Sequence, residues 1–365
     1  MFAVDMLPAG HGDALVVEYG PRAASHQLLI DAGPFHSWEG VRAELVRRRK
    51  DRYEVFVVTH IDEDHIGGAI SLLDDPDLKH RIDHVWFNGY VHCKSGGNVL
   101  GPVNGEQLTT RISEGGFHWN EGFTPRASVH VGGPVVVPSS GELPSLDLPG
   151  GARAVFLSPN GPKLKALAKA WVAVVEKAGL VPGQGDSRHS TSPKPHDREF
   201  DPLPDPLDLA ALAVLASARA SDSSPANATS IAFVLEFEGQ RVLFGADAYA
   251  GILTKGLRRY AAGVGEARPH FDLVKLAHHG SNANISEEML GLIDCQRWLV
   301  STNGDNFAHP DDAAIAKVIR SSTEPVTFYC NYRTPRTAPW EALGPGVGAT
   351  FVFPRAGRGS MRVTV

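Results

Sequence analysis

The chain has few cysteines, no long hydrophobic run and no excess of basic residues. Its 365 residues include three cysteines, Cys93, Cys295 and Cys330, which lie far apart and lack zinc-finger spacing. This usage predicts reduced, buried thiols in a cytoplasmic protein. No stretch reaches the roughly 18 apolar residues that a membrane-crossing helix needs. The N-terminus also lacks the basic start and apolar core of a signal peptide.

The composition suits a globular protein with no general attraction for polyanions. The chain is 42% hydrophobic and 21% charged, and its formal net charge is -6. No global basic field therefore draws it to nucleic acid. Its length predicts one large domain over 1–365 with insertions at about 88–149 and 181–226. The first insertion is rich in Gly, Pro and aromatic residues. It is expected either to frame a substrate pocket or to form a long ordered loop region with its own small core.

Residues 59–68 hold four potential metal ligands within six positions, His60, Asp62, Asp64 and His65. They directly follow an apolar run at 55–58 that is typical of a buried strand, and a Gly-Gly pair where a helix can begin comes after them. A charged surface loop is the alternative, but such a loop does not usually join a buried strand to a helix start. Imidazole and carboxylate groups at a strand end suit a pair of divalent ions such as zinc, manganese or iron.

This stretch resembles the metal-binding signature of the metallo-β-lactamase superfamily, His-x-His-x-Asp-His, with Asp62 where the second His usually stands. With Gly-Gly after it, the variant is most similar to the hydrolase domain of the ComEC competence proteins and their stand-alone relatives. The resemblance implies an α+β fold, an αββα sandwich of two mixed β-sheets flanked by helices. The family resemblance is stronger support for this architecture than the hydrophobic periodicity of the predicted strands and helices.

Two motifs in the second half extend the resemblance. Asp247 ends a predicted hairpin and resembles the superfamily's Gly-Asp motif, whose carboxylate bridges two metals, although Ala246 intervenes here. The run from His278 to Ser281 resembles the ComEC His-His-Gly-Ser, which implies that one His closes the metal site and the other contacts substrate. The sequence does not decide between them, and we favour His278 as the ligand. The implied set of metal ligands is His60, Asp62, Asp64, His65, Asp247, His278 and His279.

Further motifs of the same resemblance place residues around the metals. Asp31, in Asp-Ala-Gly, implies an outer carboxylate that braces the metal loop. The turn at 10–14 resembles Gly-Gln-Gly-Asp-Ala, with His11 facing the site or simply exposed in the turn. Asn227 stands where many members carry a further His; an amide oxygen binds zinc less well, which makes manganese plausible there. The candidates for substrate binding or support are His11, Asp13, Asp31, Asn227, Ser281 and Asn306.

The predicted chemistry is hydrolysis assisted by two divalent ions, with zinc favoured and manganese as the alternative. Asp64, which would orient the attacking water, and His309, which would donate a proton or bind a phosphate oxygen, are the catalytic candidates. A plain histidine before a helix is the other interpretation of His309.

The ComEC resemblance implies a phosphodiesterase or nuclease acting on a small phosphodiester or on nucleic acid. The acidic chain matches long polyanions poorly, because phosphate contacts supply much of the affinity for nucleic acid. One alternative is an ester, lactone or amide hydrolase on the same scaffold. Another is a non-catalytic metal-binding module that recognises a partner through 88–149. Membrane insertion is not expected.

Overall fold

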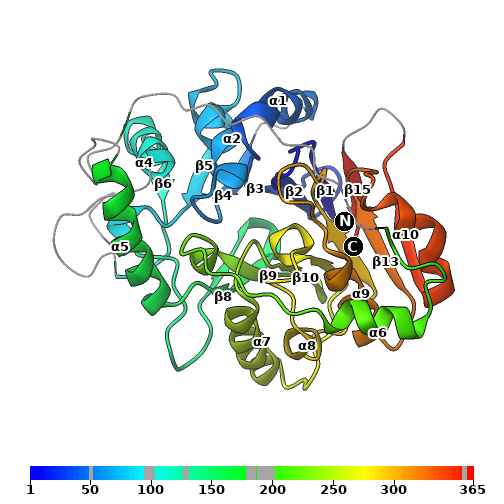
Figure 1. Cartoon of the computed structure of the whole chain (residues 1–365). Helices are drawn as coiled ribbons and strands as arrows, with labels where there is room; N and C mark the ends of the chain where they lie inside the picture. The colour runs from blue at the N-terminus through cyan, green and yellow to red at the C-terminus, as the bar shows by residue number, and fades with distance from the viewer. Residues whose placement is uncertain (49–51, 94–102, 126–130, 178–185, 187–201, 356–359) are drawn as a thin grey trace.

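The computed structural model describes residues 1–48, 52–93, 103–125, 131–177, 186, 202–355 and 360–365. Two β-sheets pack face to face in this part of the chain, and helices cover both outer faces (Figure 1). The predicted αββα sandwich of two mixed sheets is therefore confirmed.

The first sheet has seven strands in the described residues. Their spatial order is β15 (Met361–Thr364), β1 (Phe2–Met6), β2 (Leu15–Tyr19), β3 (His26–Ile30), β4 (Tyr53–Val57), β5 (Ile82–Trp86) and β6 (His118–Trp119). The pairings from β15 to β3 are antiparallel, and those from β3 to β6 are parallel. The parallel half thus brings the ends of β3 and β4 to one edge of the sheet.

The second sheet repeats this plan with eight strands in the described residues. Their order is β14 (Ala349–Val352), β13 (Val326–Cys330), β12 (Arg297–Val300), β11 (Leu273–Lys275), β10 (Gln240–Phe244), β9 (Ala232–Phe237), β8 (Arg153–Ser158) and β7 (Ser145–Asp147). Pairing is antiparallel from β7 to β10 and parallel from β10 to β14. In parallel sheets ligands bind beyond the carboxyl ends of the strands, so β10, β11 and β12 point to a site at that edge.

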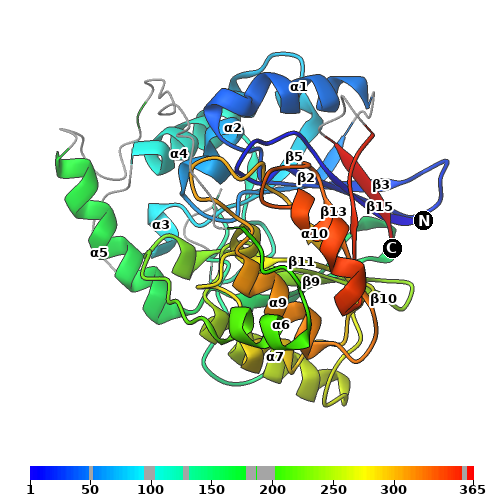
Figure 2. The ribbon, with the colours of Figure 1, turned by 45° about the vertical axis from the view of Figure 1, so that its right-hand side comes forward.

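Ten α-helices and short helical turns connect these strands in the described residues. The helices are α1 (Trp38–Arg47), α2 (Glu63–Asp74), α3 (Tyr90–Cys93), α4 (Val103–Gly115), α5 (Gly161–Lys177), α6 (Leu209–Ser217), α7 (Ala250–Val264), α8 (Glu287–Leu290), α9 (Asp312–Ser321) and α10 (Ala338–Leu343). Figures 1 and 2 both show α1 and α2 on one side of the sandwich and α6, α7 and α9 on the other.

Three separate clusters of buried side chains account for the four layers. The central cluster includes Val17 and Val57 of the first sheet and Phe233 and Phe244 of the second. A second cluster lies between the first sheet and helices α1, α2 and α4, and a third lies between the second sheet and helices α6 to α10. The central parallel strands β4, β10 and β12 therefore end in stretches buried on both faces, which the sequence shows as the continuous hydrophobic runs 55–58, 242–244 and 298–300.

Two sequence-based predictions about these elements are wrong. The sequence predicts that residues 361–365 form a strand of the second sheet, but β15 pairs with β1 in the first. Met361 and Val363 alternate with exposed residues and face the central core. Both sheets line this core, so the alternation does not determine which sheet the strand joins. The sequence predicts only a short helix at 69–73, after the Gly-Gly pair, but α2 begins earlier, at Glu63, so Asp64 and His65 lie in its first turn.

The segments predicted as insertions contribute ordered elements to this architecture. Residues 88–149 carry α3 and α4 and also β6 and β7, which lie at the edges of the two sheets. Of the segment 181–226, residues 181–185 and 187–201, with His189 and His196, lie outside the described residues, and 202–226 include α6. Their status as insertions in one domain stays a prediction.

Two expectations about composition can be compared with the structure. Cys93, Cys295 and Cys330 are all buried and form no disulfide. In the portions of the chain with described coordinates, every helix is too short or too polar to cross a bilayer.

Candidate metal centre

The first half of the centre is built where β4 ends and α2 begins. His60 follows the strand, and Asp62 takes the extended conformation of the residue that precedes a helix, with φ -70° and ψ 144°. Asp64 and His65 then lie in the first turn of α2. Carboxylates are favoured there because the unpaired N–H groups of a helix start carry partial positive charge. An early helix start therefore fixes both side chains on a rigid element.

The second half comes from the ends of β10 and β11 across the sandwich. Asp247 follows β10 after Ala246, whose φ of 43° turns the chain. His278 and His279 follow β11 in a tight turn with φ values of 48° and 54°. Left-handed backbone at non-glycine residues costs on the order of 1–3 kcal/mol each and is typical of functional sites. Here the turn directs both imidazole rings toward Asp247.

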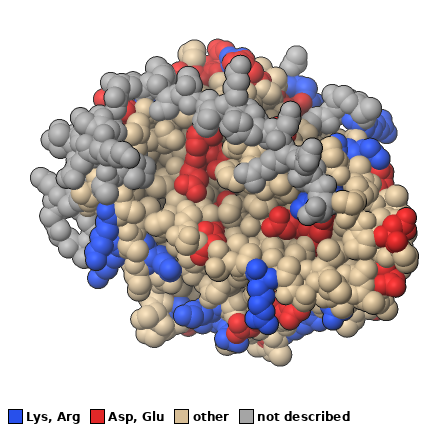
Figure 3. Space-filling view, in the orientation of Figure 1, with Lys and Arg blue, Asp and Glu red and all other residues tan. Residues whose placement is uncertain are grey.

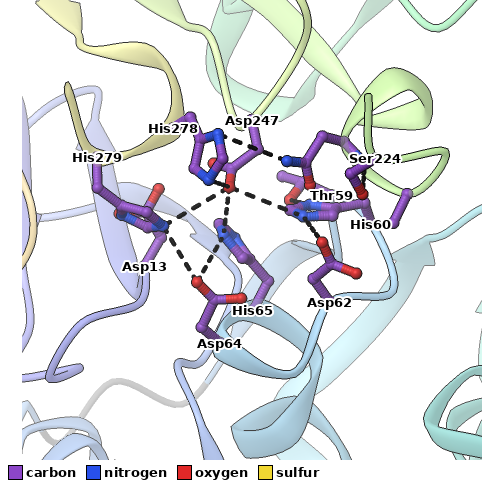
Figure 4. Close-up of polar contacts among 12 residues, drawn as sticks. Asp13, Thr59, His60, Asp62, Asp64, His65, Ser224, Asp247, His278 and His279 are labelled. Carbon is purple, nitrogen blue, oxygen red and sulfur yellow. Dashed lines mark hydrogen bonds and ion pairs between the residues drawn. The ribbon is translucent and has the colours of Figure 1, made fainter. Parts of the chain in front are cut away.

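Four imidazole rings converge on one carboxylate oxygen (Figure 4). The distances from Oδ2 of Asp247 to the nearest Nε2 atoms are 3.3 Å for His65 and 3.5 Å for His278. The corresponding distances are 3.7 Å for His279 and 3.9 Å for His60. Two ligands of one tetrahedral zinc ion lie about 3.3 Å apart when their bonds are about 2.0 Å long. The distances from the four nitrogens to Oδ2 of Asp247 are therefore similar to those between two ligands of one cation.

The first pair of rings is oriented by Asp31, which follows β3. Nδ1 of His65 donates a hydrogen bond to Oδ2 of Asp31, at 2.8 Å. The hydroxyl of Thr59 also donates to Asp31, at 2.7 Å, and lies 3.1 Å from Nδ1 of His60. Because the hydroxyl proton is committed to Asp31, Nδ1 of His60 must donate to the hydroxyl oxygen. Both rings therefore carry a proton on Nδ1, which leaves Nε2 as the atom that a metal ion could bind.

The second pair of rings is held in the same way from the other sheet. Nδ1 of His279 donates to the backbone carbonyl of Ser301, at 2.9 Å. Nδ1 of His278 donates to Oδ1 of Asn284, at 2.8 Å, and lies 3.5 Å from Oδ2 of Asp222. The amide nitrogen of Asn284 donates to the carbonyl of Asp247, at 3.0 Å, which fixes its orientation. Such outer partners set the tautomer of metal-binding histidines.

The consequence is a buried cluster of polar atoms without hydrogen-bond partners. Among the described residues, Nε2 of His60, His65 and His279 and Oδ1 of Asp247 are buried without a hydrogen-bond partner. Buried polar atoms are otherwise almost always paired, and each unpaired one costs about 1–3 kcal/mol. Cations at this position would satisfy all four atoms at once, so the donor set fits divalent metal ions.

The candidate ligands fall into two groups on either side of Asp247. Oδ2 of Asp64 lies 3.4 Å from Nε2 of His279 and 3.9 Å from Nε2 of His65. On the other side, Oδ2 of Asp62 lies 3.7 Å from Nε2 of His60. Asp13 also approaches the first group, since single ligand atoms of Asp13, His65, Asp247 and His279 all lie within 4.8 Å of one another.

Without metal ions, protons on the imidazoles offset the negative charge of the buried carboxylates. Burial alone would raise the pKa of Asp247, but His65 and the other imidazoles hold it well below its usual range. Burial opposes a charge on His279, yet Asp13 and Asp247 raise its pKa to about 10. His60, in contrast, has its pKa lowered to about 3, mainly by burial. Metal ions would offset the same carboxylates and displace these protons.

Two further predicted residues, Asp31 and Asn227, lie beside the histidines of the centre. Asp31 contacts His65 directly, as described above. Asn227 donates from its amide nitrogen to Asp222, at 2.7 Å, and that nitrogen lies 3.5 Å from Nδ1 of His278, while its oxygen is buried without a partner. Asn227 thus faces the candidate ligand His278, and its amide nitrogen rather than its oxygen is directed at the ring.

Two histidines and two short polar residues lie around this core. His309 is buried, and its ring packs edge-on against His278, with centroids 5.3 Å apart. His11 is also buried, 3% exposed, and stacks on His36, so it is not an exposed turn residue. Among the described residues, no side-chain hydrogen bond joins Ser281 or Asn306 to the metal ligands. The hydroxyl of Ser281 accepts instead from the backbone N–H of Ala283, at 3.4 Å.

The sequence reasoning missed three supporting residues. Asp222 and Asn284 form the hydrogen-bonded frame behind His278, with 3.0 Å between the Asn284 amide nitrogen and Oδ2 of Asp222. Lys275 is 1% exposed and its ammonium group lies 2.6 Å from Oδ2 of Asp13. A lysine inside the apolar run 271–277 was a usable signal, since lysine is almost never fully buried unless paired. Asp222 and Asn284 lie in ordinary polar loops and gave no such signal.

Comparison with known proteins finds similarity only among solved structures. No family model matches the chain, and no curated protein matches it. One similar structure is CmlA, a diiron beta-hydroxylase from Streptomyces venezuelae, with 13% identity and a TM-score of 0.41 over 100% of this chain and 54% of that chain. Another is the MIM-2 metallo-beta-lactamase, with 11% identity and a TM-score of 0.27 over 74% of each chain. The chain spans about half the length of CmlA, and similarities this low say nothing about its activity.

Proposed function

We propose that this chain is a hydrolase that uses two divalent metal ions to cleave phosphodiesters. The ligands of one ion would be His60, Asp62 and His278, those of the other Asp64, His65 and His279, with Asp247 shared between them. The observation that carries the proposal is the convergence of four Nε2 atoms on Oδ2 of Asp247, at 3.3–3.9 Å. The imidazole-rich set favours zinc, and the carboxylates also admit manganese.

Bound ions of this kind polarise the substrate and lower the pKa of a coordinated water to about 7. The chain's own contribution is to hold the ligands and to manage protons. Asp31, Asn284 and the Ser301 carbonyl fix three imidazole rings through Nδ1. Asp64, 8% exposed and at the start of a helix, would accept a hydrogen bond from the attacking water and orient it. Hydrolysis then breaks the bond from phosphorus to the leaving oxygen, and water supplies the new oxygen.

His309 would bind the substrate in this proposal. Its ring packs against that of the ligand His278. Burial lowers the pKa of His309, although Asp311, 3.4 Å from its Nδ1, opposes this effect. A neutral imidazole suits hydrogen bonding to a phosphate oxygen better than proton donation. We therefore propose phosphate binding rather than proton donation as the role of His309.

Phosphodiesters are proposed because of the motifs and the charge of the chain. The ComEC-like motifs at 60–68 and 278–281 imply a phosphodiesterase or nuclease. The net charge is -6, and on the face seen in Figure 3 acidic residues lie both near the middle and at the edges, with lysines and arginines scattered among them. Long nucleic acids need many basic contacts to bind. Small phosphodiesters or short oligonucleotides are therefore the proposed substrates.

A substrate panel tests this proposal. Protein freed of metal and then loaded with zinc or manganese would be assayed on bis(p-nitrophenyl) phosphate, short oligonucleotides, long duplex DNA, a lactone and a p-nitrophenyl ester. We expect metal-dependent cleavage of the phosphodiesters, with the oligonucleotide preferred over the duplex. Metal-dependent turnover of the lactone or ester alone would identify an acyl hydrolase on the same centre. No metal-dependent turnover of any substrate would point to a binding module.

A further inference from the structure

A second cluster of metal-binding side chains lies outside the catalytic centre. His84 is on β5 and His118 opens β6, and the register of this parallel pair sets them directly opposite each other. Glu121 follows three residues after His118. On its other side, His84 pairs with Val55 of β4. Val55 precedes His60 by five residues, on the order of 15 Å along the strand direction, so this cluster is distinct from the catalytic centre.

The two imidazole rings face a single carboxylate. Their centroids are 4.8 Å apart, with 26° between the ring planes. Nδ1 of His118 lies 3.0 Å from Oε1 of Glu121, and Nδ1 of His84 lies 4.0 Å from Oε2. These distances bracket the separation of about 3.3 Å expected for two ligands of one tetrahedral zinc ion. One ligand atom from each residue lies within 4.8 Å of the other two.

A simple ion pair explains only part of this arrangement. Glu121 and His118 are three residues apart and would pair without help from the strand β5. The ion pair does not account for the second imidazole, which the strand register stacks on the first and turns toward the same carboxylate. Charging both rings would place two like charges side by side. A divalent cation instead binds both rings in their neutral form and offsets the carboxylate.

We propose that His84, His118 and Glu121 bind a divalent cation of the zinc type that fastens β6 to β5. The side chains are 36%, 53% and 40% exposed, which leaves room for water to complete the coordination and lets the ion exchange. The site would be structural. Trp119, next to His118, already donates from its indole to the carbonyl of Phe87, at 2.8 Å, and the cation would add a second tie at the edge of the sheet.

Metal content distinguishes this site from the catalytic one. The wild-type chain, His118→Gln, Glu121→Gln and the control His80→Gln would be dialysed against the same buffered micromolar zinc, and zinc per chain measured by mass spectrometry. His80 is exposed and is not part of the cluster. We expect His118→Gln and Glu121→Gln to bind one ion fewer than the wild type and His80→Gln, with unchanged hydrolysis of the diester.

The informative quantity is the difference between variants, so it does not depend on how many ions the catalytic centre holds. Equal zinc content in all four proteins would overturn the proposal and leave a plain His–Glu ion pair. If His118→Gln fails to fold, as circular dichroism would show, Glu121→Gln decides alone, because it keeps both rings. Failure of the proposed hydrolase activity would leave this difference unaffected.

Discussion

Asp247→Asn is expected to lower turnover of bis(p-nitrophenyl) phosphate by more than about 100-fold. Removing only the outer partners of metal ligands typically costs 10- to 100-fold, and Asp247 is the group on which four ligand nitrogens converge. Asparagine has nearly the same shape but lacks the negative charge, so the two ions would lose the anion between them. The measurement is steady-state turnover with zinc and with manganese, together with metal content.

Asp294→Asn is the matched control for this change. Asp294 is a carboxylate that pairs with His270, at 3.1 Å, and has no contact with the proposed ligands among the described residues. We expect the control to keep wild-type activity and metal content. Asp247→Asn turning over the diester at the wild-type rate would contradict the dinuclear assignment. The neutral amide can donate to an adjacent imidazole nitrogen, so the variant should still fold.

Lys275→Met is expected to destabilise the protein by about 3–5 kcal/mol, the cost of removing one partner of a buried ion pair. Lys275 and Asp13 are 1% and 2% exposed, and their charged groups lie 2.6 Å apart. Burial would raise the pKa of Asp13, but Lys275 and His279 hold it below its usual range. Without the ammonium group, the carboxylate remains charged in the core. Urea unfolding measures the loss.

A double variant separates the charge from the packing. Lys275→Met combined with Asp13→Leu removes both charges and leaves an apolar pair, and replacement of a whole buried pair is often neutral. We expect the double variant to recover most of the lost stability. It should still lose activity, since Oδ1 of Asp13 lies 3.4 Å from Nδ1 of His279. A single variant within about 1 kcal/mol of the wild type would show that the pair contributes little.

The sequence predicted the elements better than their arrangement. Hairpin β9–β10 is predictable because Glu238 and Gly239 lie between two apolar runs. The structure places a turn there, with φ values of 50° and 82°. Strand β15 was found but assigned to the wrong sheet, because hydrophobic alternation encodes a face and not a partner strand. The two-sheet architecture itself came from the resemblance of motifs. The hydrophobic periodicity along a strand is the same whether the strands form one sheet or two, so it does not predict the number of sheets.

The centre was predictable where residue type was unusual for its position. Histidine and aspartate follow directly after buried strands at His60, Asp247 and His278, and this pattern predicts the centre. The residues that orient these rings, such as Asn284 and Thr59, are common loop residues. Their roles depend on contacts across the fold, which no local pattern encodes. The same is true of the facing of His84 and His118, which depends on the register of β5 and β6.

The most direct test of the dinuclear centre is a crystal of the zinc-loaded protein measured on both sides of the zinc absorption edge. The anomalous signal locates zinc independently of any assumption about activity. Two strong peaks flanking the carboxylate of Asp247, one beside His60 and His278 and one beside His65 and His279, are the predicted result. An absence of anomalous density between these four imidazoles at saturating zinc would contradict the account.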